Sequence, residues 1–131
     1  MLARDIPIDE FMSETLITIA PDLPINDAKE RMAENGIRHV PVVEGSRLIG
    51  ILSARDILIF ESIPTEPNII WPVSAAMTAR PITCATDTTL GEALDLMSNE
   101  SIGAIPVMDG YVLKGIFTTV DAIELLNKAL I

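Results

Sequence analysis

The chain has 131 residues, of which 49% are hydrophobic and 21% are charged, and its formal net charge is −10. This composition fits one compact domain or two half-domains with a shared core, and it excludes intrinsic disorder, because apolar content is high and long blocks of like charge are absent. An acidic balance of this size repels nucleic acid and anionic membranes, so we expect neither as a partner.

We expect neither a membrane span nor a secretory signal from this sequence. No apolar run approaches the roughly 18 residues of a bilayer span, and residues 1–5 lack the apolar stretch of a secretory signal. We therefore expect a cytoplasmic protein. The single cysteine, Cys84, excludes an internal disulfide and fits a reducing compartment. Its apolar surroundings favour a small core residue.

The two halves of the sequence carry one pattern, since residues 12–60 fall on residues 77–125 without a gap. This period predicts two copies of one supersecondary unit, each too small to close its own core, with a natural ligand site at their seam. We expect an N-terminal extension (residues 1–10), two repeats (11–62 and 76–131) and a linker (63–75), forming one compact module.

Each repeat predicts the same elements. A β-rich run (residues 16–19 or 81–84) precedes an amphipathic helix, which Ile25, Ala28 and Met32 mark in the first copy. In the second copy Thr89 and Glu92 have the spacing of a capping box. Two strands follow, joined by turns at Gly45 and Gly110, and a closing helix starts near Ser53 or Thr118. The unit is β-α-β-β-α, and the fold class is α/β (α+β).

The segment between the copies contains Pro64, Pro67 and Pro72, which predict a linker rather than a helix or a central strand. Trp71 lies in this segment. Two interpretations of it stay open: it seals the core where the linker crosses it, or it is an exposed anchor for a partner.

The strongest local signal is Gly50-Ile51-Leu52-Ser53-Ala54-Arg55-Asp56, which Gly115-Ile116-Phe117-Thr118-Thr119-Val120-Asp121 duplicates. Glycine admits a ligand close to the backbone, the hydroxyl and the helix-start amides can bind a phosphate oxygen, and the aspartate can accept bonds from ribose hydroxyls. The same spacing is also a helix-start pattern without any ligand. The duplication favours the ligand site.

The chain resembles a tandem pair of CBS domains, a Bateman module, over about residues 11–126. The likeness rests on Met12 and Met77, on residues 37–43 and 102–108, and on the two Gly-x-x-Ser/Thr-x-x-Asp endings. It implies two sheets packed about a pseudo-two-fold axis, with clefts that bind AMP, ADP, ATP or S-adenosylmethionine in many relatives. It also implies a homodimer and a regulatory rather than catalytic role, with an unknown regulated protein and no required cofactor.

The two clefts are expected to differ. The stronger ligand site comprises Arg38, His39, Ser53, Arg55 and Asp56, because arginine forks bind phosphate through charge-assisted bonds. The weaker site keeps Thr118 and Asp121 but has Gly103, Ala104 and Val120 in place of the basic residues. His39 is the only histidine, so a role as a partly buried polar residue stays open beside binding. The resemblance also suggests Thr18 and Thr83 as adenine contacts, with β-propensity as the alternative.

The sequence favours one function class over two others. We expect a nucleotide-sensing module, and a ligand-independent interaction or scaffold module is the alternative. An enzyme is not expected, because the sequence has no glycine-rich phosphate loop, no metal-ligand cluster and no Cys/His pair at a plausible spacing.

Overall fold

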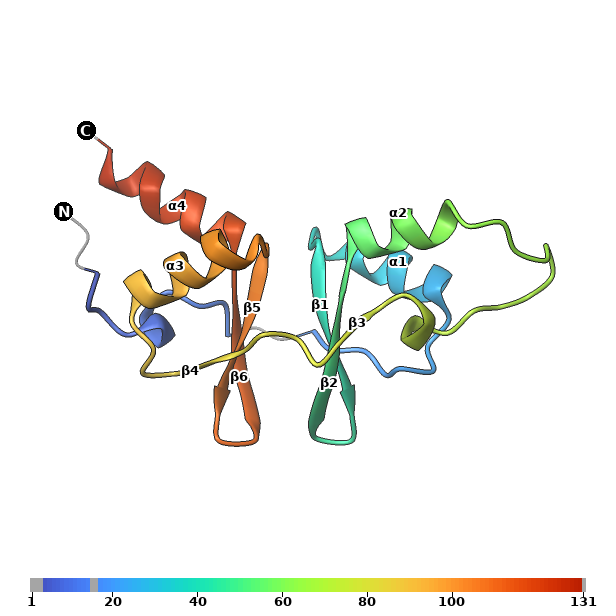
Figure 1. Ribbon diagram of the computed structural model, residues 1–131, viewed down its shortest axis with the longest axis horizontal. Coiled ribbons are helices and arrows are strands. Elements are labelled where there is room, and N and C mark those ends of the chain that lie inside the picture. The colour runs from blue at the N-terminus through green and yellow to red at the C-terminus, as the bar shows by residue number, and fades with distance from the viewer. Residues whose placement is uncertain (1–3, 15–16, 131) are drawn as a thin grey trace. The chain divides into compact units, whose positions relative to one another are not determined.

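The computed structural model describes residues 4–14 and 17–130. Residues 1–3 of the expected extension and Leu16 of the first expected strand lie outside the described residues. The chain forms two compact units. Unit 1 combines residues 4–14 with residues 82–130, and unit 2 comprises residues 17–81. In each unit both α-helices lie on the same side of a small sheet (Figure 1).

Unit 2 contains a three-stranded antiparallel sheet in the order β1-β2-β3. Its elements are α1 (Ile25–Glu34), β1 (His39–Glu44), β2 (Arg47–Ser53), α2 (Ala54–Glu61), the 3-10 helix η2 (Val73–Ala75) and β3 (Thr78–Ala79). The first expected strand is reduced to one parallel bridge between Ile19 and Val42.

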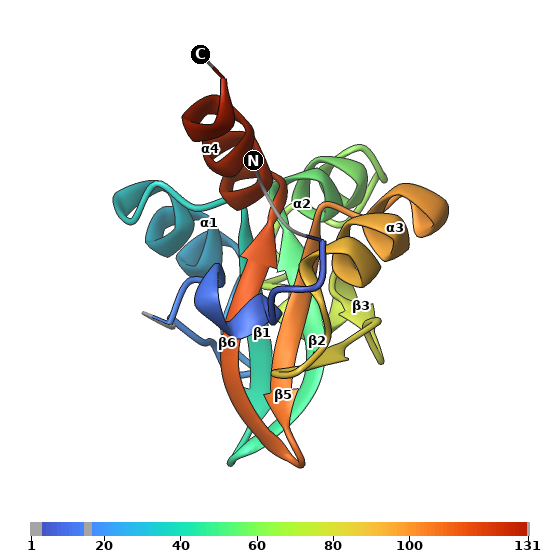
Figure 2. The ribbon, with the colours of Figure 1, turned by 90° about the vertical axis from the view of Figure 1, so that its left-hand side faces the viewer.

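Unit 1 repeats this plan with the sheet order β4-β5-β6, in which β4 runs parallel to β5 and β6 antiparallel to it. Its elements are the 3-10 helix η1 (Ile8–Glu10), β4 (Cys84–Ala85), α3 (Leu90–Glu100), β5 (Ala104–Asp109), β6 (Val112–Thr118) and α4 (Thr119–Ala129). The predicted α+β class with two β-α-β-β-α repeats is confirmed. Figure 2 looks onto this unit, with η1 in front of its strands.

Local signals place most of these elements. The Thr89 hydroxyl accepts from the Glu92 amide at 3.2 Å, and the Glu92 carboxylate accepts from the Thr89 amide at 3.4 Å, so the predicted capping box is confirmed. The two hairpins turn at Gly45 and Gly110, which have φ angles of +63° and +59°. Only glycine adopts such angles without strain.

Each unit has its own hydrophobic core between its sheet and its helices. The core of unit 2 consists of Ile19, Ile25, Ala28, Met32, Val40, Val42, Leu52, Ile57 and Val73. The core of unit 1 consists of Ile8, Leu90, Ala93, Met97, Ile105, Val107 and Phe117. Ile8 and Val73 are completely buried in these cores. Ile8 lies before the first repeat in the chain, but it belongs to the core of unit 1, which contains the second repeat. Val73 lies before the second repeat, but it belongs to the core of unit 2, which contains the first repeat.

The segments before the two repeats are therefore exchanged. The Val73 amide donates to the Leu23 carbonyl at 2.8 Å, and in unit 1 the Ile8 amide donates to the Thr88 carbonyl at 2.7 Å. The exchange continues in the sheets, where β3 pairs with β2 and Ser13 pairs with Ile116 of β6. Each sequence repeat is completed by a segment that stands before the other repeat or at its start.

None of the helices in the described ranges combines the length and the apolar character that a bilayer span requires.

Candidate functional site

The duplicated motif forms the junction between a strand and the helix that follows it in each unit. Ser53 ends β2 and caps α2, and Thr118 ends β6 and caps α4. The Ser53 hydroxyl accepts from the Asp56 amide at 2.9 Å, and Asp56 Oδ2 accepts from the Ser53 amide at 2.9 Å. The helix-start interpretation of this spacing is therefore correct in both copies, and it coexists with the ligand interpretation.

The helix cap at Ser53 uses only one of the two carboxylate oxygens of Asp56. The hydrogen bonds between described residues use Oδ2 of Asp56 and leave Oδ1 without a partner. Ser53 accepts through its hydroxyl oxygen and keeps its own proton to donate. Both side chains are half-buried. A half-buried carboxylate that is held in place and has one spare oxygen is suited to accept bonds from vicinal hydroxyls.

The helix-start amides are less available than the sequence suggested. The Ala54 amide donates to the Arg38 carbonyl at 2.9 Å, and the Asp56 amide donates to Ser53. The Thr119 amide donates likewise to the Gly103 carbonyl at 3.0 Å. Two of the first three amides of α2 are thus used within unit 2 and are not available to a ligand.

The motif glycines also have a different role from the expected one. A Cβ atom on Gly50 would lie 2.6 Å from Met77 Sδ and 2.9 Å from the Thr78 carbonyl oxygen. At Gly115 the corresponding distances to Met12 Sδ and the Ser13 carbonyl oxygen are 2.5 and 2.8 Å. The exchanged segment, and not a ligand, occupies the space that each glycine leaves open.

Basic groups gather at the junction in unit 2. Arg38 and Arg55 are exposed, and no carboxylate of a described residue forms an ion pair with either guanidinium. His39 starts β1 opposite Ser53. Burial is the main cause that lowers the pKa of His39 from 6.5; Asp56 opposes this shift and Arg38 adds to it. The structure therefore brings Arg38, His39, Ser53 and Asp56 into one neighbourhood.

The junction in unit 1 has the same backbone but different chemistry. Asp121 Oδ2 accepts from the Thr118 amide at 2.8 Å and from the Thr118 hydroxyl at 3.2 Å. Gly103, Ala104 and Val120 stand where unit 2 has Arg38, His39 and Arg55. This junction therefore offers a carboxylate without the basic groups.

Ser13 is a residue of this junction that sequence reasoning missed. Its hydroxyl donates to Asp121 Oδ1 at 3.2 Å, so both carboxylate oxygens of Asp121 have partners. The available signal was the match between Ser13 and Thr78, two hydroxyl residues that each follow an aligned methionine. The match alone does not indicate the contact, because it is the segment exchange that brings Ser13 to Asp121.

The two threonines expected at the adenine lie just before the first pairing residue of each sheet. Thr18 is half-buried and precedes Ile19, whereas Thr83 is exposed and precedes β4. No hydrogen bond between described residues joins either threonine to Asp56 or Asp121. Their role as adenine contacts stays a prediction.

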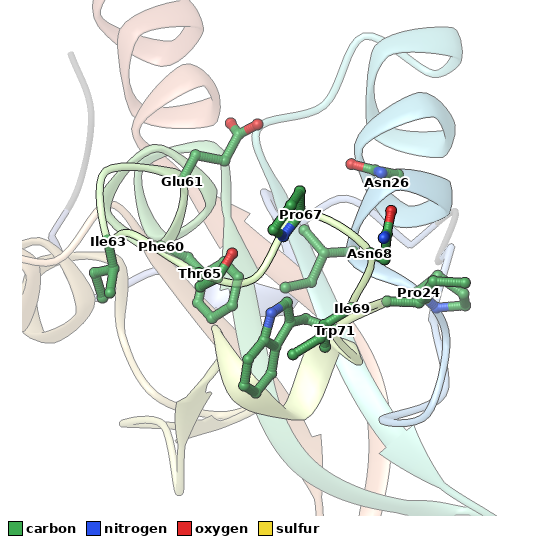
Figure 3. Close-up of a pocket in the computed structure, with 12 residues that line it drawn as sticks. Pro24, Asn26, Phe60, Glu61, Ile63, Thr65, Pro67, Asn68, Ile69 and Trp71 are labelled. Atoms are coloured by element: carbon green, nitrogen blue, oxygen red, sulfur yellow. The ribbon is translucent and has the colours of Figure 1, made fainter.

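Unit 2 also contains a hollow of about 440 Å³ between the linker and the helices α1 and α2, lined by none of the predicted site residues (Figure 3). Phe60 and Trp71 meet at its wall edge to face, with ring centroids 5.7 Å apart. Trp71 is half-buried against the core of unit 2. This placement supports the interpretation that Trp71 seals the core.

Comparison with known proteins agrees with the duplicated architecture. The family model described as the CBS domain matches twice, at residues 4–62 and 73–128. The chain belongs to the CBS domain family. The two matches together cover most of the sequence, and each includes one of the strand-to-helix junctions that hold Asp56 and Asp121.

The curated relatives of this CBS pair include large enzymes and small proteins. The chain is 32% identical over 100 residues to an inosine-5′-monophosphate dehydrogenase of Korarchaeum cryptofilum, of which it spans 20%. It is 30% identical over 135 residues to a CBS domain-containing protein of Dictyostelium discoideum. That match covers 94% of this chain and 92% of the relative. CBS pairs similar to this one thus occur both inside enzymes and as most of a short protein.

Solved structures match nearly the whole chain. An uncharacterized conserved protein from Pyrococcus horikoshii is 26% identical with a TM-score of 0.86, and the match covers 99% of this chain and 98% of that one. The CBS domain pair of protein MJ0100 is 25% identical with a TM-score of 0.85, covering 95% and 98% of the two chains. It was crystallised in complex with 5′-methylthioadenosine and S-adenosyl-L-methionine.

Proposed function

We propose that this CBS pair is a regulatory module that binds an adenosine-containing ligand, such as AMP, ADP, ATP or S-adenosylmethionine. Binding would alter its own assembly or the activity of a partner protein, without catalysis by the module and without a required cofactor. The observation that carries the proposal is the carboxylate of Asp56, held by the Ser53 cap with Oδ1 left for a ligand.

The recognition chemistry follows from the groups around this carboxylate. Asp56 would accept hydrogen bonds from the ribose hydroxyls, and Ser53 would donate its hydroxyl proton to a ligand oxygen. The free guanidinium groups of Arg38 and Arg55 would bind phosphate, with His39 beside them. Thr18 and Thr83 remain proposed adenine contacts. The ligands in the complex of the MJ0100 CBS pair, both built on adenosine, support this class.

Regulation requires that the ligand has different affinities for two arrangements of the module or of its complex with a partner. A ligand that bridges Arg38, just before β1, and Arg55 in α2 would favour the arrangement in which both groups face it. We further propose that the module works as a homodimer.

Calorimetric titration with AMP, ADP, ATP and S-adenosylmethionine tests the proposal. We expect binding by at least one of them and weaker binding of its 2′-deoxy form, because the carboxylate then loses a donor. Asp56→Asn should weaken binding about tenfold or more, since hydrogen bonds to charged groups contribute about 1.5–3 kcal/mol each. Asp121→Asn is the matched variant in unit 1. If none of the four ligands binds, the proposal is wrong.

One observation favours the scaffold alternative for part of the molecule. Both carboxylate oxygens of Asp121 already have partners within unit 1, and basic residues are absent from the corresponding positions of this junction. A ligand-independent interaction module would keep the same assembly state whether or not a nucleotide is added. Sedimentation with and without ligand therefore distinguishes the two functions.

A further inference from the structure

The hollow between the linker and the helices α1 and α2 lies apart from the proposed nucleotide site, since neither Asp56 nor its neighbours line it (Figure 3). Its volume of about 440 Å³ is within the range of small-molecule sites. Three linker side chains that border it, Ile63, Ile69 and Ile70, are 54%, 48% and 79% exposed. A molecule in the hollow would remove part of this apolar surface from water.

In unit 1 the chain itself covers the start of the equivalent helix, α3. The Leu90 amide donates to the Ile6 carbonyl at 2.8 Å, and the Gly91 amide donates to the Arg4 carbonyl at 2.8 Å. The Arg4 side chain lies over Gly91, where a Cβ atom would be 2.8 Å from Arg4 Cζ. Its guanidinium pairs with Asp95 at 2.6 Å. The N-terminal segment therefore stays on α3 along two consecutive hydrogen bonds.

The linker of unit 2 keeps only the first of these two hydrogen bonds. The Ile25 amide donates to the Trp71 carbonyl at 3.0 Å. No described residue accepts from the amide of Asn26, which corresponds to Gly91. The side chain of Asn26 also blocks the close approach that Arg4 makes to Gly91. The linker thus leaves α1 at this point, and the hollow lies between them.

The polar groups of the hollow offer hydrogen bonds without a free charge. Trp71 Nε1 is buried and has no hydrogen-bond partner among the described residues. The carboxamides of Asn26 and Asn68 line the hollow, and neither bonds to a described side chain or backbone group. Glu61 also lines it, but Lys29 Nζ donates to both of its carboxylate oxygens, at 3.2 and 3.1 Å. None of the described lining residues is basic.

We propose that this hollow binds an uncharged aromatic molecule that carries a carbonyl oxygen, of the aryl amide class. The ring packs against Phe60 and the linker isoleucines, where it extends the edge-to-face pair of Phe60 and Trp71. The carbonyl oxygen accepts from Trp71 Nε1, and the amide group pairs with the carboxamide of Asn68. Because Nε1 is buried, the linker shifts on binding. This site is additional to the proposed nucleotide site and does not depend on it.

Titration of the isotope-labelled chain with benzamide, in the absence of nucleotide, tests the site by NMR. The chain contains a single tryptophan, so one indole N–H signal reports on Nε1 of Trp71. We expect this signal to shift and to saturate with a Kd of about 10 mM or lower, as for a fragment of this size. Benzoate has nearly the same shape but a negative charge. It should bind about fivefold more weakly, because no described basic residue lines the hollow.

Two exposed asparagines provide matched variants that leave the cores intact. Asn68→Ala should raise the Kd for benzamide about threefold or more, the effect of one lost hydrogen bond. Asn99→Ala, on α3 and outside the hollow, should leave this Kd unchanged. The inference is overturned if the indole signal shows no saturable shift, if benzoate binds as tightly as benzamide, or if the two variants bind alike. Because no nucleotide is present, failure of the nucleotide proposal would not affect these results.

Discussion

Met12 packs its thioether sulfur over Gly115, 2.5 Å from the point where a Cβ atom of residue 115 would stand. The Ser13 carbonyl oxygen lies 2.8 Å from the same point, in a segment that forms two backbone hydrogen bonds with Ile116. Met77 and Thr78 surround Gly50 in the same way. The glycine of the motif is thus explained by the exchanged segment.

Gly115→Ala should therefore destabilise the protein in the absence of any ligand, by about 1–3 kcal/mol, because the new methyl group overlaps a backbone oxygen that cannot rotate away. Gly50→Ala should also destabilise the protein, because its methyl group would overlap the Thr78 carbonyl oxygen. Urea unfolding measures the effect. If both variants keep full stability and lose only nucleotide affinity, the ligand and not the segment requires these glycines.

The second prediction concerns the ends of the two equivalent helices α1 and α3. Gly36 has φ +62° after α1, and Ser101 has φ +52° at the corresponding position after α3. Since a side chain in the left-handed region is strained, Ser101→Gly should stabilise the protein by about 0.5–1 kcal/mol.

Gly36→Ser provides the matched control and should destabilise by a similar amount, because no atom near Gly36 adds a steric clash. Thermal unfolding of the two variants compares the two ends directly. A loss of stability in Ser101→Gly would show that the serine makes a compensating contact.

The third prediction follows from the segment exchange. Residues 17–81 include Val73 and β3, so as a separate fragment they should fold and unfold cooperatively. Residues 11–62 form the sequence repeat but lack the completely buried Val73 and the strand that covers Gly50. We expect them to remain largely unfolded. Circular dichroism during urea titration checks both; a folded 11–62 fragment would contradict the exchange.

The fourth prediction concerns the pH dependence of stability. Burial lowers the pKa of His39 from 6.5, so the unfolded chain binds a proton at higher pH than the folded one. The stability that neutral His39 contributes is present above pH 6.5 and is lost as the pH falls toward the lower folded pKa.

Unfolding free energies at about pH 7.5 and about pH 5.5 measure this loss. His39→Gln removes the titrating imidazole and leaves every carboxylate of the chain in place. The decrease on acidification should be smaller in His39→Gln than in the wild type. An equal decrease would mean that burial of His39 does not matter to folding.

Much of each unit is predictable because its signals are local. The Thr89–Glu92 capping box and the turns at Gly45 and Gly110 depend on residues that are close in the chain, and helical spacing marked the faces of α1 and α3. Each of these signals involves side chains whose positions the local backbone conformation already sets. The neighbourhood of Arg38, His39, Ser53 and Asp56 was predictable for the same reason, since one hairpin leads directly into α2.

The amino-acid sequence by itself determined the duplication, the helices and hairpins, and the capped aspartates. Only the tertiary structure decided that Ile8 enters the core of unit 1, that Met12 and Met77 cover the motif glycines, and that Ser13 binds Asp121. These contacts join segments far apart in the chain, and backbone hydrogen bonds, such as the two between Ser13 and Ile116, fix those segments in place. Such bonds are the same for nearly every residue type, so they leave no pattern in the order of side chains.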